Sequence, residues 1–319
     1  MPGALGCWTG VKFIRLRYRY KKLSDSLEFT GERFTPECER EIWYEHYHRY
    51  ALAVRWCANM RTLDAACGEG YGSAMLAQSA ASVEGVDISP QAIEHAQQRY
   101  GHLQGVEFQV ADCTSLPFAD DEFDRVVSFE TLEHLAEHDS LLAEFRRVLK
   151  PDGCLILSSP DKATYSDDQD NVNEFHVKEL YREELELLIG RHFPAHRLLG
   201  QKLMFHSAIW SMEGFDRVAI DQVSAGATHS PGSITQPPMY FIALCAAQPS
   251  SLPGVDGCLW LFDDREESVY QHYHSEIKRH MAAGGIIAGL EKQIAELKDR
   301  LDQSNPPPDS WWRRFFSKT

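Results

Sequence analysis

The stretch TLDAACGEGYGSAML, residues 62–76, places Gly68, Gly70 and Gly72 between an apolar run and a helix-forming run. An apolar strand, a glycine-rich turn and a helix in this order are typical of the first unit of an open α/β sheet. Bare backbone and the start of a helix then lie at the carboxyl end of the strand, where such sheets bind ligands. The stretch therefore predicts a binding site that a ligand approaches closely.

Strands and helices alternate on either side of this stretch. Apolar or β-branched runs predict strands within 61–67, 82–88, 106–112, 123–130 and 154–160, and helical runs lie at about 72–80, 90–100 and 139–149. A helix is expected within 35–56, another over 176–193, and two late strands within 196–210 and 239–248, separated by a loop at about 222–238. Such alternation predicts a doubly wound, mostly parallel seven-stranded sheet.

Charge and cysteine usage limit the classes of partner and compartment. Asp and Glu number 47 against 32 Lys and Arg, a formal charge of -15, which disfavours a nucleic-acid partner. The eight cysteines are scattered without a CxxC pair, so we expect reduced thiols and a cytoplasmic location. The first 24 residues contain six basic residues and no long apolar run, so neither a signal peptide nor a membrane span is predicted.

The nature of the ligand is narrowed by three features. A dinucleotide loop would have glycine or alanine at its sixth motif position, which here is Ser73. The loop CGEGYG has no basic residue and no Gly-Lys-Ser/Thr follows, which excludes an ATP-type P-loop. Asp87 ends the second predicted strand, where a carboxylate accepts hydrogen bonds from ribose hydroxyls; the alternative is that it caps the helix starting near Ser89. An adenosine-containing ligand is therefore expected.

Further motifs follow in a recognisable order. LDAACGEGYG, VDIS, ADCTSLPF, FDRVVSFETLEHL and LKPDGCLILSSP, all between residues 62 and 160, resemble the class I S-adenosylmethionine-dependent methyltransferases, in particular their methyltransferase-11-like branch. The resemblance implies S-adenosylmethionine as cofactor and a Rossmann-like fold. It implies the following contacts: the methionine part against Gly68, Gly70 and Gly72, the ribose on Asp87 beside Ile88, and the adenine amino group on Asp112 beside the Cys113 backbone. Ala66 replaces the family's usual glycine, and slightly tighter packing is expected there.

A methyl acceptor with a proton to lose needs a base near the transferred methyl group. His134, just past the fourth predicted strand, is the first candidate, and His176 is the second because a similar Phe-His segment lines the acceptor pocket of carbohydrate-cluster relatives. The alternative for both histidines is a local structural role. Glu130, Glu133 and Asp161 are expected to orient a histidine or bind sugar hydroxyls. A metal site assembled from them is the alternative, although nothing in their spacing asks for a metal.

The segment FTGERFTPECEREIWYEHYHRY, residues 29–50, resembles methyltransferases of bacterial surface-polysaccharide clusters. This resemblance implies a sugar hydroxyl of a glycan or its precursor as acceptor. Trp43, Tyr44 and Tyr47 either stack on the sugar or pack on the core, the commoner outcome. The rival hypotheses are a methyltransferase of quinone or small-metabolite synthesis, a catalytically silent partner in glycan assembly, and a nicotinamide dehydrogenase.

The ends of the chain differ from its centre. We expect a basic tail (1–27), a methyltransferase domain (28–250), a connector with a helix (251–285), a short coiled coil (286–304) and an aromatic, basic tail (305–319). The coiled-coil seam is Ile287, Leu290, Ile294, Leu297 and Leu301, which favours a homodimer or a partner helix. The two tails either touch an anionic membrane, which would place the protein at the inner membrane surface, or are disordered or packed in an oligomer.

Overall fold

A computed structural model describes residues 41–168, 173–204, 221–222, 230–231, 234, 236–262 and 268–304. Several predicted segments lie outside these residues: the two tails, the segment 28–40, most of the loop at 222–238 and the end of the strand predicted within 196–210. The expectation of membrane contact through the tails therefore stays a prediction. No helix of the described chain combines the length and the apolar character needed to cross a membrane.

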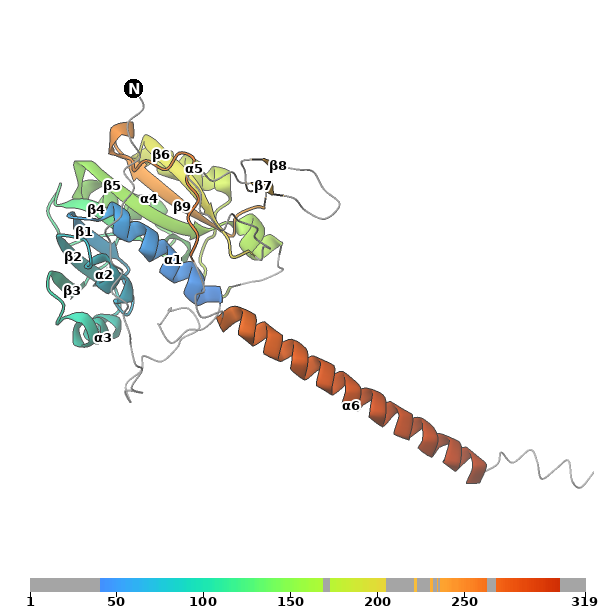
Figure 1. Ribbon diagram of the computed structural model, residues 1–319. Helices are drawn as coiled ribbons and strands as arrows, with labels where there is room; N and C mark the ends of the chain where they lie inside the picture. Colours follow the sequence, from blue (N-terminus) through green and yellow to red (C-terminus); the bar gives the residue numbers. More distant parts are fainter. Residues whose placement is uncertain are drawn as a thin grey trace, which may run out of the picture.

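One seven-stranded sheet forms the centre of the fold, in the order β3-β2-β1-β4-β5-β9-β6 (Figure 1). Its strands are β1 Arg61–Ala65, β2 Ser82–Asp87, β3 Val106–Val110, β4 Phe123–Ser128, β5 Leu149–Pro160, β6 Ala195–Gln201 and β9 Tyr240–Ala246. The first five run parallel, and β9 runs antiparallel to both β5 and β6. The predicted doubly wound, mostly parallel sheet is confirmed.

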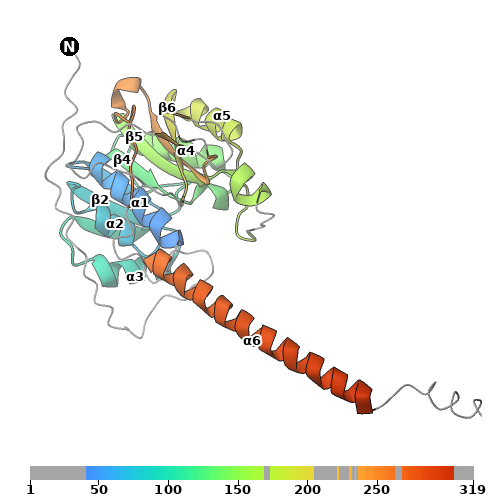
Figure 2. The ribbon, with the colours of Figure 1, turned by 45° about the vertical axis from the view of Figure 1, so that its right-hand side comes forward.

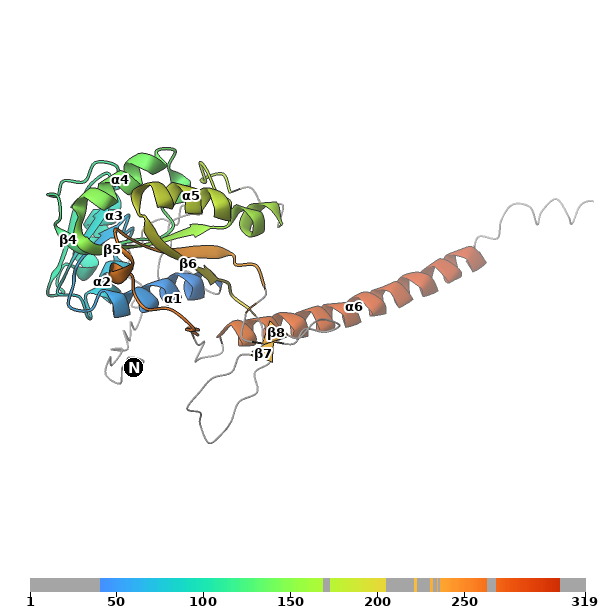
Figure 3. The same cartoon turned by 90° about the horizontal axis from the view of Figure 1, so that it is seen from above.

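Helices cover both faces of this sheet (Figures 2 and 3). One face carries α1 Glu41–Trp56, α2 Tyr71–Leu76 and α3 Pro90–Tyr100, and the other carries α4 His138–Val148 and α5 Arg182–His192. Alternating strand residues supply the two cores: Leu63 packs in the cluster with α4 and α5, whereas Val83 packs in the cluster with α1 and α2. Short elements complete the fold: η1 Leu132–His134, η2 Ala163–Asp167, β7 Asp221–Gln222, β8 Ser230–Pro231 and η3 Pro249–Ser251.

The strand order determines which edge of the sheet can bind a ligand. Consecutive strands β1, β2 and β3 extend to one side, and β4 lies on the other side of β1. The order reverses at β1 and β4, and a crevice opens at the carboxyl ends of strands where such a reversal occurs. The segments that follow β1, β2 and β4 therefore meet at one edge of the sheet.

Three boundaries differ from those predicted. The helix expected over 176–193 begins only at Arg182, because Tyr181 forms its N-terminal cap with Glu184 in a capping box. The helix expected over 72–80 ends at Leu76. Strand β5 begins at Leu149 rather than Cys154, with an irregularity in its pairing to β4.

The helix α6, Ser268–Ser304, extends away from the α/β domain (Figure 1). It is one continuous helix, so the predicted boundary between connector and coiled coil lies inside it. The side chains of the predicted seam, Ile287, Leu290, Ile294, Leu297 and Leu301, are 52% to 65% exposed. Pairing of this seam with another helix stays a prediction.

Candidate active site

The glycine loop follows β1 and turns sharply into α2. Gly68 and Gly70 have φ of 57° and 90°, in the left-handed region that favours glycine. A Cβ on Gly70 would lie 2.7 Å from the Ala96 Cβ, and a Cβ on Gly72 would lie 2.1 Å from the Tyr50 ring. A Cβ on Gly68 would meet nothing within 4 Å. Gly70 and Gly72 thus allow the loop to pack on α3 and α1, whereas Gly68 faces open space.

Ala66 lies in the same loop with a φ of 61°. The left-handed region costs an L-residue about 1–2 kcal/mol. The replacement of the family's glycine therefore produces backbone strain, which the expectation of slightly tighter packing did not include.

Asp87 ties the loop to the end of β2. Its buried carboxylate accepts the backbone N–H of Gly68 at 3.0 Å and that of Ser89 at 2.8 Å. The helix cap considered for Asp87 is supplied by Ser89, whose hydroxyl accepts the Ala92 N–H at 3.3 Å. Because a carboxylate has about four acceptor positions, Asp87 retains capacity for ligand hydroxyls.

Ile88 and Asp112 lie next along this edge. The Ile88 side chain is 70% exposed beside Asp87, an unusual position for a large apolar residue. Asp112 follows β3 and is exposed; it accepts hydrogen bonds from the Thr114 hydroxyl and N–H, which lower the pKa of its carboxyl. Cys113 is buried, and burial raises the pKa of its thiol to about 12, so it stays neutral. The edge thus offers an exposed apolar side chain and two carboxylates.

Two buried acidic residues that the sequence reasoning did not single out support the loop. Asp64 accepts the Tyr50 hydroxyl at 3.0 Å and the Ser73 hydroxyl at 2.6 Å. Burial raises the Asp64 pKa to about 6 against these hydrogen bonds, which lower it, and the Asp87 charge raises it further. Glu69 accepts the Tyr100 hydroxyl at 3.0 Å, and burial raises its pKa as well. Both acidic residues lie within the glycine-rich stretch, and this position is the sequence feature that could have identified them.

These features fit S-adenosylmethionine, a nucleoside without phosphate. The loop CGEGYG has no basic side chain for a phosphate, and Gly68 leaves room for close approach of the ligand to the main chain. A ribose would meet Asp87, and an adenine face would meet the exposed Ile88. The assignment of individual residues to parts of the cofactor stays a prediction.

Glu130, at the end of β4, has a partner that the sequence did not suggest. Its carboxylate lies 2.5 Å from the Arg49 guanidinium and accepts the Ser158 hydroxyl at 2.7 Å. Arg49 is 1% exposed and lies 4.5 Å from the centre of the Tyr240 ring. The Glu130 carboxylate therefore compensates a buried positive charge, and its expected action on a histidine or a substrate hydroxyl stays a prediction.

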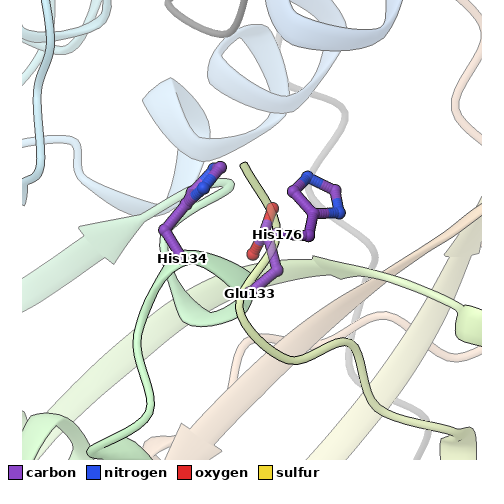
Figure 4. Close-up of side chains that lie close together, drawn as sticks. All are labelled: Glu133, His134 and His176. Carbon is purple, nitrogen blue, oxygen red and sulfur yellow. The ribbon is translucent and has the colours of Figure 1, made fainter. Parts of the chain in front are cut away.

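His134 and His176 are brought together although they lie far apart in the sequence. Their ring centres are 5.1 Å apart, and Figure 4 shows the Glu133 side chain between them. The backbone N–H groups of Val177 and Lys178 donate to the Glu133 carbonyl at 2.8 and 3.0 Å. These two bonds hold the segment before α5 against η1, which explains why the helix starts late.

Each histidine has its Nδ1 engaged. The His134 Nδ1 lies 3.2 Å from the Phe175 carbonyl oxygen, and the His176 Nδ1 lies 2.5 Å from the Glu179 carboxylate. Both partners are acceptors, so each Nδ1 donates a hydrogen bond to its partner. Glu179 also accepts the Ser166 hydroxyl at 2.5 Å. Its spacing of three residues from His176 was the sequence signal for this pair.

Asp161 and the aromatic residues of α1 have local roles. Asp161 accepts the Ala163 N–H at 3.2 Å at the start of η2. Tyr44 is buried, and Trp43 and Tyr47 stack at a ring distance of 4.3 Å within the layer between α1 and the sheet. The core-packing alternative for these aromatic residues thus agrees with the structure.

Comparisons with known proteins identify the family of the chain. Residues 63–157 match the family model described as a methyltransferase domain. A probable S-adenosylmethionine-dependent methyltransferase of Mycolicibacterium smegmatis is 35% identical over 190 residues, which cover 58% of this chain and 72% of that protein. A demethylmenaquinone methyltransferase of Clavibacter sepedonicus is 42% identical over 105 residues, 33% of this chain and 43% of that protein.

Among solved structures, the PH0226 protein from Pyrococcus horikoshii is similar at 25% identity and a TM-score of 0.46, over 53% of this chain and 93% of that one. The fold assignment rests on the strand order instead of this score. The same conclusion follows from the methyltransferase-domain match, the Mycolicibacterium relative and a glycine loop suited to a nucleoside without phosphate. The chain belongs to the S-adenosylmethionine-dependent methyltransferases, with S-adenosylmethionine as its cofactor.

Proposed function

We propose that the protein transfers the methyl group of S-adenosylmethionine to a hydroxyl of a sugar, in a bacterial surface glycan or its precursor. The observation that carries this proposal is the His134–His176 pair with Glu179 behind it. A hydroxyl must lose its proton as it takes the methyl group, and a positioned imidazole or imidazole-bound group serves this purpose near neutral pH. The sulfonium of the cofactor supplies an already activated methyl group.

The two histidines lie at the edge of the sheet where the proposed transfer requires them. The strands β1 and β4 pair in parallel, so the segments after both strands emerge at the same edge. Gly68 follows β1, and His134 follows β4. An acceptor beside the two imidazoles would thus lie next to a cofactor held by the glycine loop, which is the alignment that a displacement reaction requires.

The polar character of this region supports a sugar over an apolar acceptor. Ser166 and Glu179 share a hydrogen bond of 2.5 Å near the histidines, and Tyr165 stacks on His176 at a ring distance of 5.3 Å. Hydroxyl groups of a sugar find acceptors and donors among such side chains. The resemblance expected for residues 29–50 to methyltransferases of surface-polysaccharide clusters would imply the same acceptor class.

A second candidate acceptor is a quinone or a small aromatic metabolite. Phe175 and Val177, on either side of His176, are 43% and 61% exposed, and they offer apolar contact to a ring. The similarity to a demethylmenaquinone methyltransferase points in the same direction. A catalytically silent partner in glycan assembly is the third candidate.

The test is a transfer assay with isotope-labelled methyl donor and two acceptor sets, one of nucleotide sugars and lipid-linked saccharides, the other of demethylmenaquinones. We expect label in an O-methyl sugar, with turnover reduced at least about a hundredfold in His134→Gln and in His176→Gln. His102→Gln, which alters an exposed histidine after α3, serves as the matched control and keeps full turnover. Label found only in the quinone would establish the second candidate, and label in neither set would favour the silent partner.

A further inference from the structure

Glu133, His134 and His176 form the one group of three metal-ligating side chains found in the described part of the chain. Each offers one ligand atom, and these atoms all lie within 4.8 Å of one another (Figure 4). Glu133 is 1% exposed, and the two histidines are half-buried. The spacing in the sequence does not indicate a metal site, because His176 lies 42 positions after His134.

The hydrogen bonds behind the histidines match those of metal ligands. A metal-binding histidine almost always donates its second ring N–H to a carboxylate or a backbone carbonyl, which fixes its tautomer and its orientation. Here the His176 Nδ1 meets the Glu179 carboxylate at 2.5 Å, and the His134 Nδ1 meets the Phe175 carbonyl at 3.2 Å. These two contacts orient the imidazole rings. These bonds are independent of the clustering of the three side chains.

We propose that Glu133, His134 and His176 bind a divalent first-row transition-metal ion. Two imidazoles and one carboxylate suit zinc, cobalt, manganese or iron, and three protein ligands leave coordination positions open for a substrate. Bonds of about 2.0–2.2 Å would bring the ligand atoms to about 3–3.5 Å from one another. Small side-chain rotations close the group to that size from its present limit of 4.8 Å.

The role of the ion rests on the proposed function. An acceptor hydroxyl in an open position would have its pKa lowered by the cation and lose its proton to solvent. The oxygen then forms a bond to the methyl carbon while the carbon–sulfur bond breaks, and the electron pair of that bond stays on the sulfur. The two histidines would thus act through the cation rather than as direct bases.

The first test measures metal binding alone. Tag-free, chelator-treated full-length protein is titrated calorimetrically with Mn²⁺, Zn²⁺ and Co²⁺, and the Co²⁺ complex is recorded by visible absorption. We expect one ion per chain, with affinity weakened at least about a hundredfold in His134→Gln and His176→Gln. Glu179→Gln should weaken it by about 10- to 100-fold, the range for residues that support a ligand. His102→Gln, an exposed histidine elsewhere, should leave it unchanged.

The metal-site proposal would be overturned if the wild type did not bind one metal ion per chain. It would also be overturned if the wild type and both histidine variants bound the ion with equal affinity. Circular dichroism of each variant verifies that it is folded. S-adenosylmethionine titrated into the same metal-free protein separates the two proposals: cofactor binding without metal binding overturns the metal site alone, and absence of cofactor binding overturns the methyl transfer. Full methyl transfer after metal removal would overturn the catalytic role of the ion, and activity restored by added Mn²⁺ or Co²⁺ would support it.

Discussion

Asp64 makes stability depend on pH in a direction unusual for an aspartate. Its side chain is fully buried beneath the glycine loop, and burial raises its pKa from 3.8 to about 6. The folded protein therefore holds a proton on Asp64 at pH values where the unfolded chain has released it. This contribution to stability is complete below about pH 4 and is lost as the pH rises through about 6. The full loss is about 3 kcal/mol, at about 1.4 kcal/mol per pKa unit.

The substitution Asp64→Asn removes this titration while keeping the size of the side chain. The Asn oxygen can accept the Tyr50 hydroxyl, and the Asn amide can donate to the Ser73 hydroxyl. Relative to wild type, we expect the variant to gain about 1.4 kcal/mol of unfolding free energy between about pH 5 and about pH 7.5, where about half of the effect is accessible.

The assay is urea unfolding of both proteins at these two pH values, followed by tryptophan fluorescence. Other ionisable groups titrate in both proteins. The deciding quantity is therefore the difference in unfolding free energy between variant and wild type, and how this difference changes with pH. A difference that stays constant with pH would refute a raised Asp64 pKa. A difference that changes in the opposite direction would refute burial as the dominant cause.

Three further predictions concern strain, a buried ion pair and the long helix. Ala66→Gly should raise the free energy of unfolding by up to about 1 kcal/mol, because relief of left-handed strain exceeds the added chain entropy; urea unfolding tests this, and a destabilised variant would contradict it. Glu130→Gln should lower the free energy of unfolding by about 3 kcal/mol, because it leaves Arg49 without its counter-charge, and the added substitution Arg49→Met should restore most of this loss. A Glu130→Gln variant with full stability but lost turnover would instead indicate a catalytic role for Glu130. Because isoleucine and leucine alternate over the first four positions of the α6 seam, we expect two copies to form a parallel two-stranded coiled coil. Light scattering should show a dimer for the wild type and a monomer for the double variant Leu290→Lys, Leu297→Lys, whereas a monomeric wild type would contradict the pairing.

Features encoded in short stretches were predictable from the sequence. The strand, glycine turn and helix around Gly68 lie within 15 residues, and Asp87 closes the next strand. Periodicity reports such local order directly, and the parallel topology follows from strands that alternate with helices. The sheet and the cofactor class were therefore predictable.

Features made by long-range packing were not predictable in this way. The contact between His134 and Phe175 spans 41 residues, and Arg49 reaches Ser158 across 109. The apolar and polar pattern of α1 does not show that Arg49 will be buried, so the partner of Glu130 was missed. The late start of α5 has the same origin, because the residues before it bond to the Glu133 carbonyl instead of forming a helical turn.

The most direct test of the cofactor site is calorimetric titration with S-adenosylmethionine and S-adenosylhomocysteine, of wild type beside Asp87→Ala and Asp112→Ala. Asp87 anchors the glycine loop through Gly68 and offers the remaining acceptors for a ribose, whereas Asp112 is exposed at the predicted adenine end. We predict one cofactor per chain at micromolar affinity, lost in Asp87→Ala and weakened in Asp112→Ala, with circular dichroism verifying that the variants are folded. Equal affinity in all three proteins, or no binding by the wild type, would contradict the account.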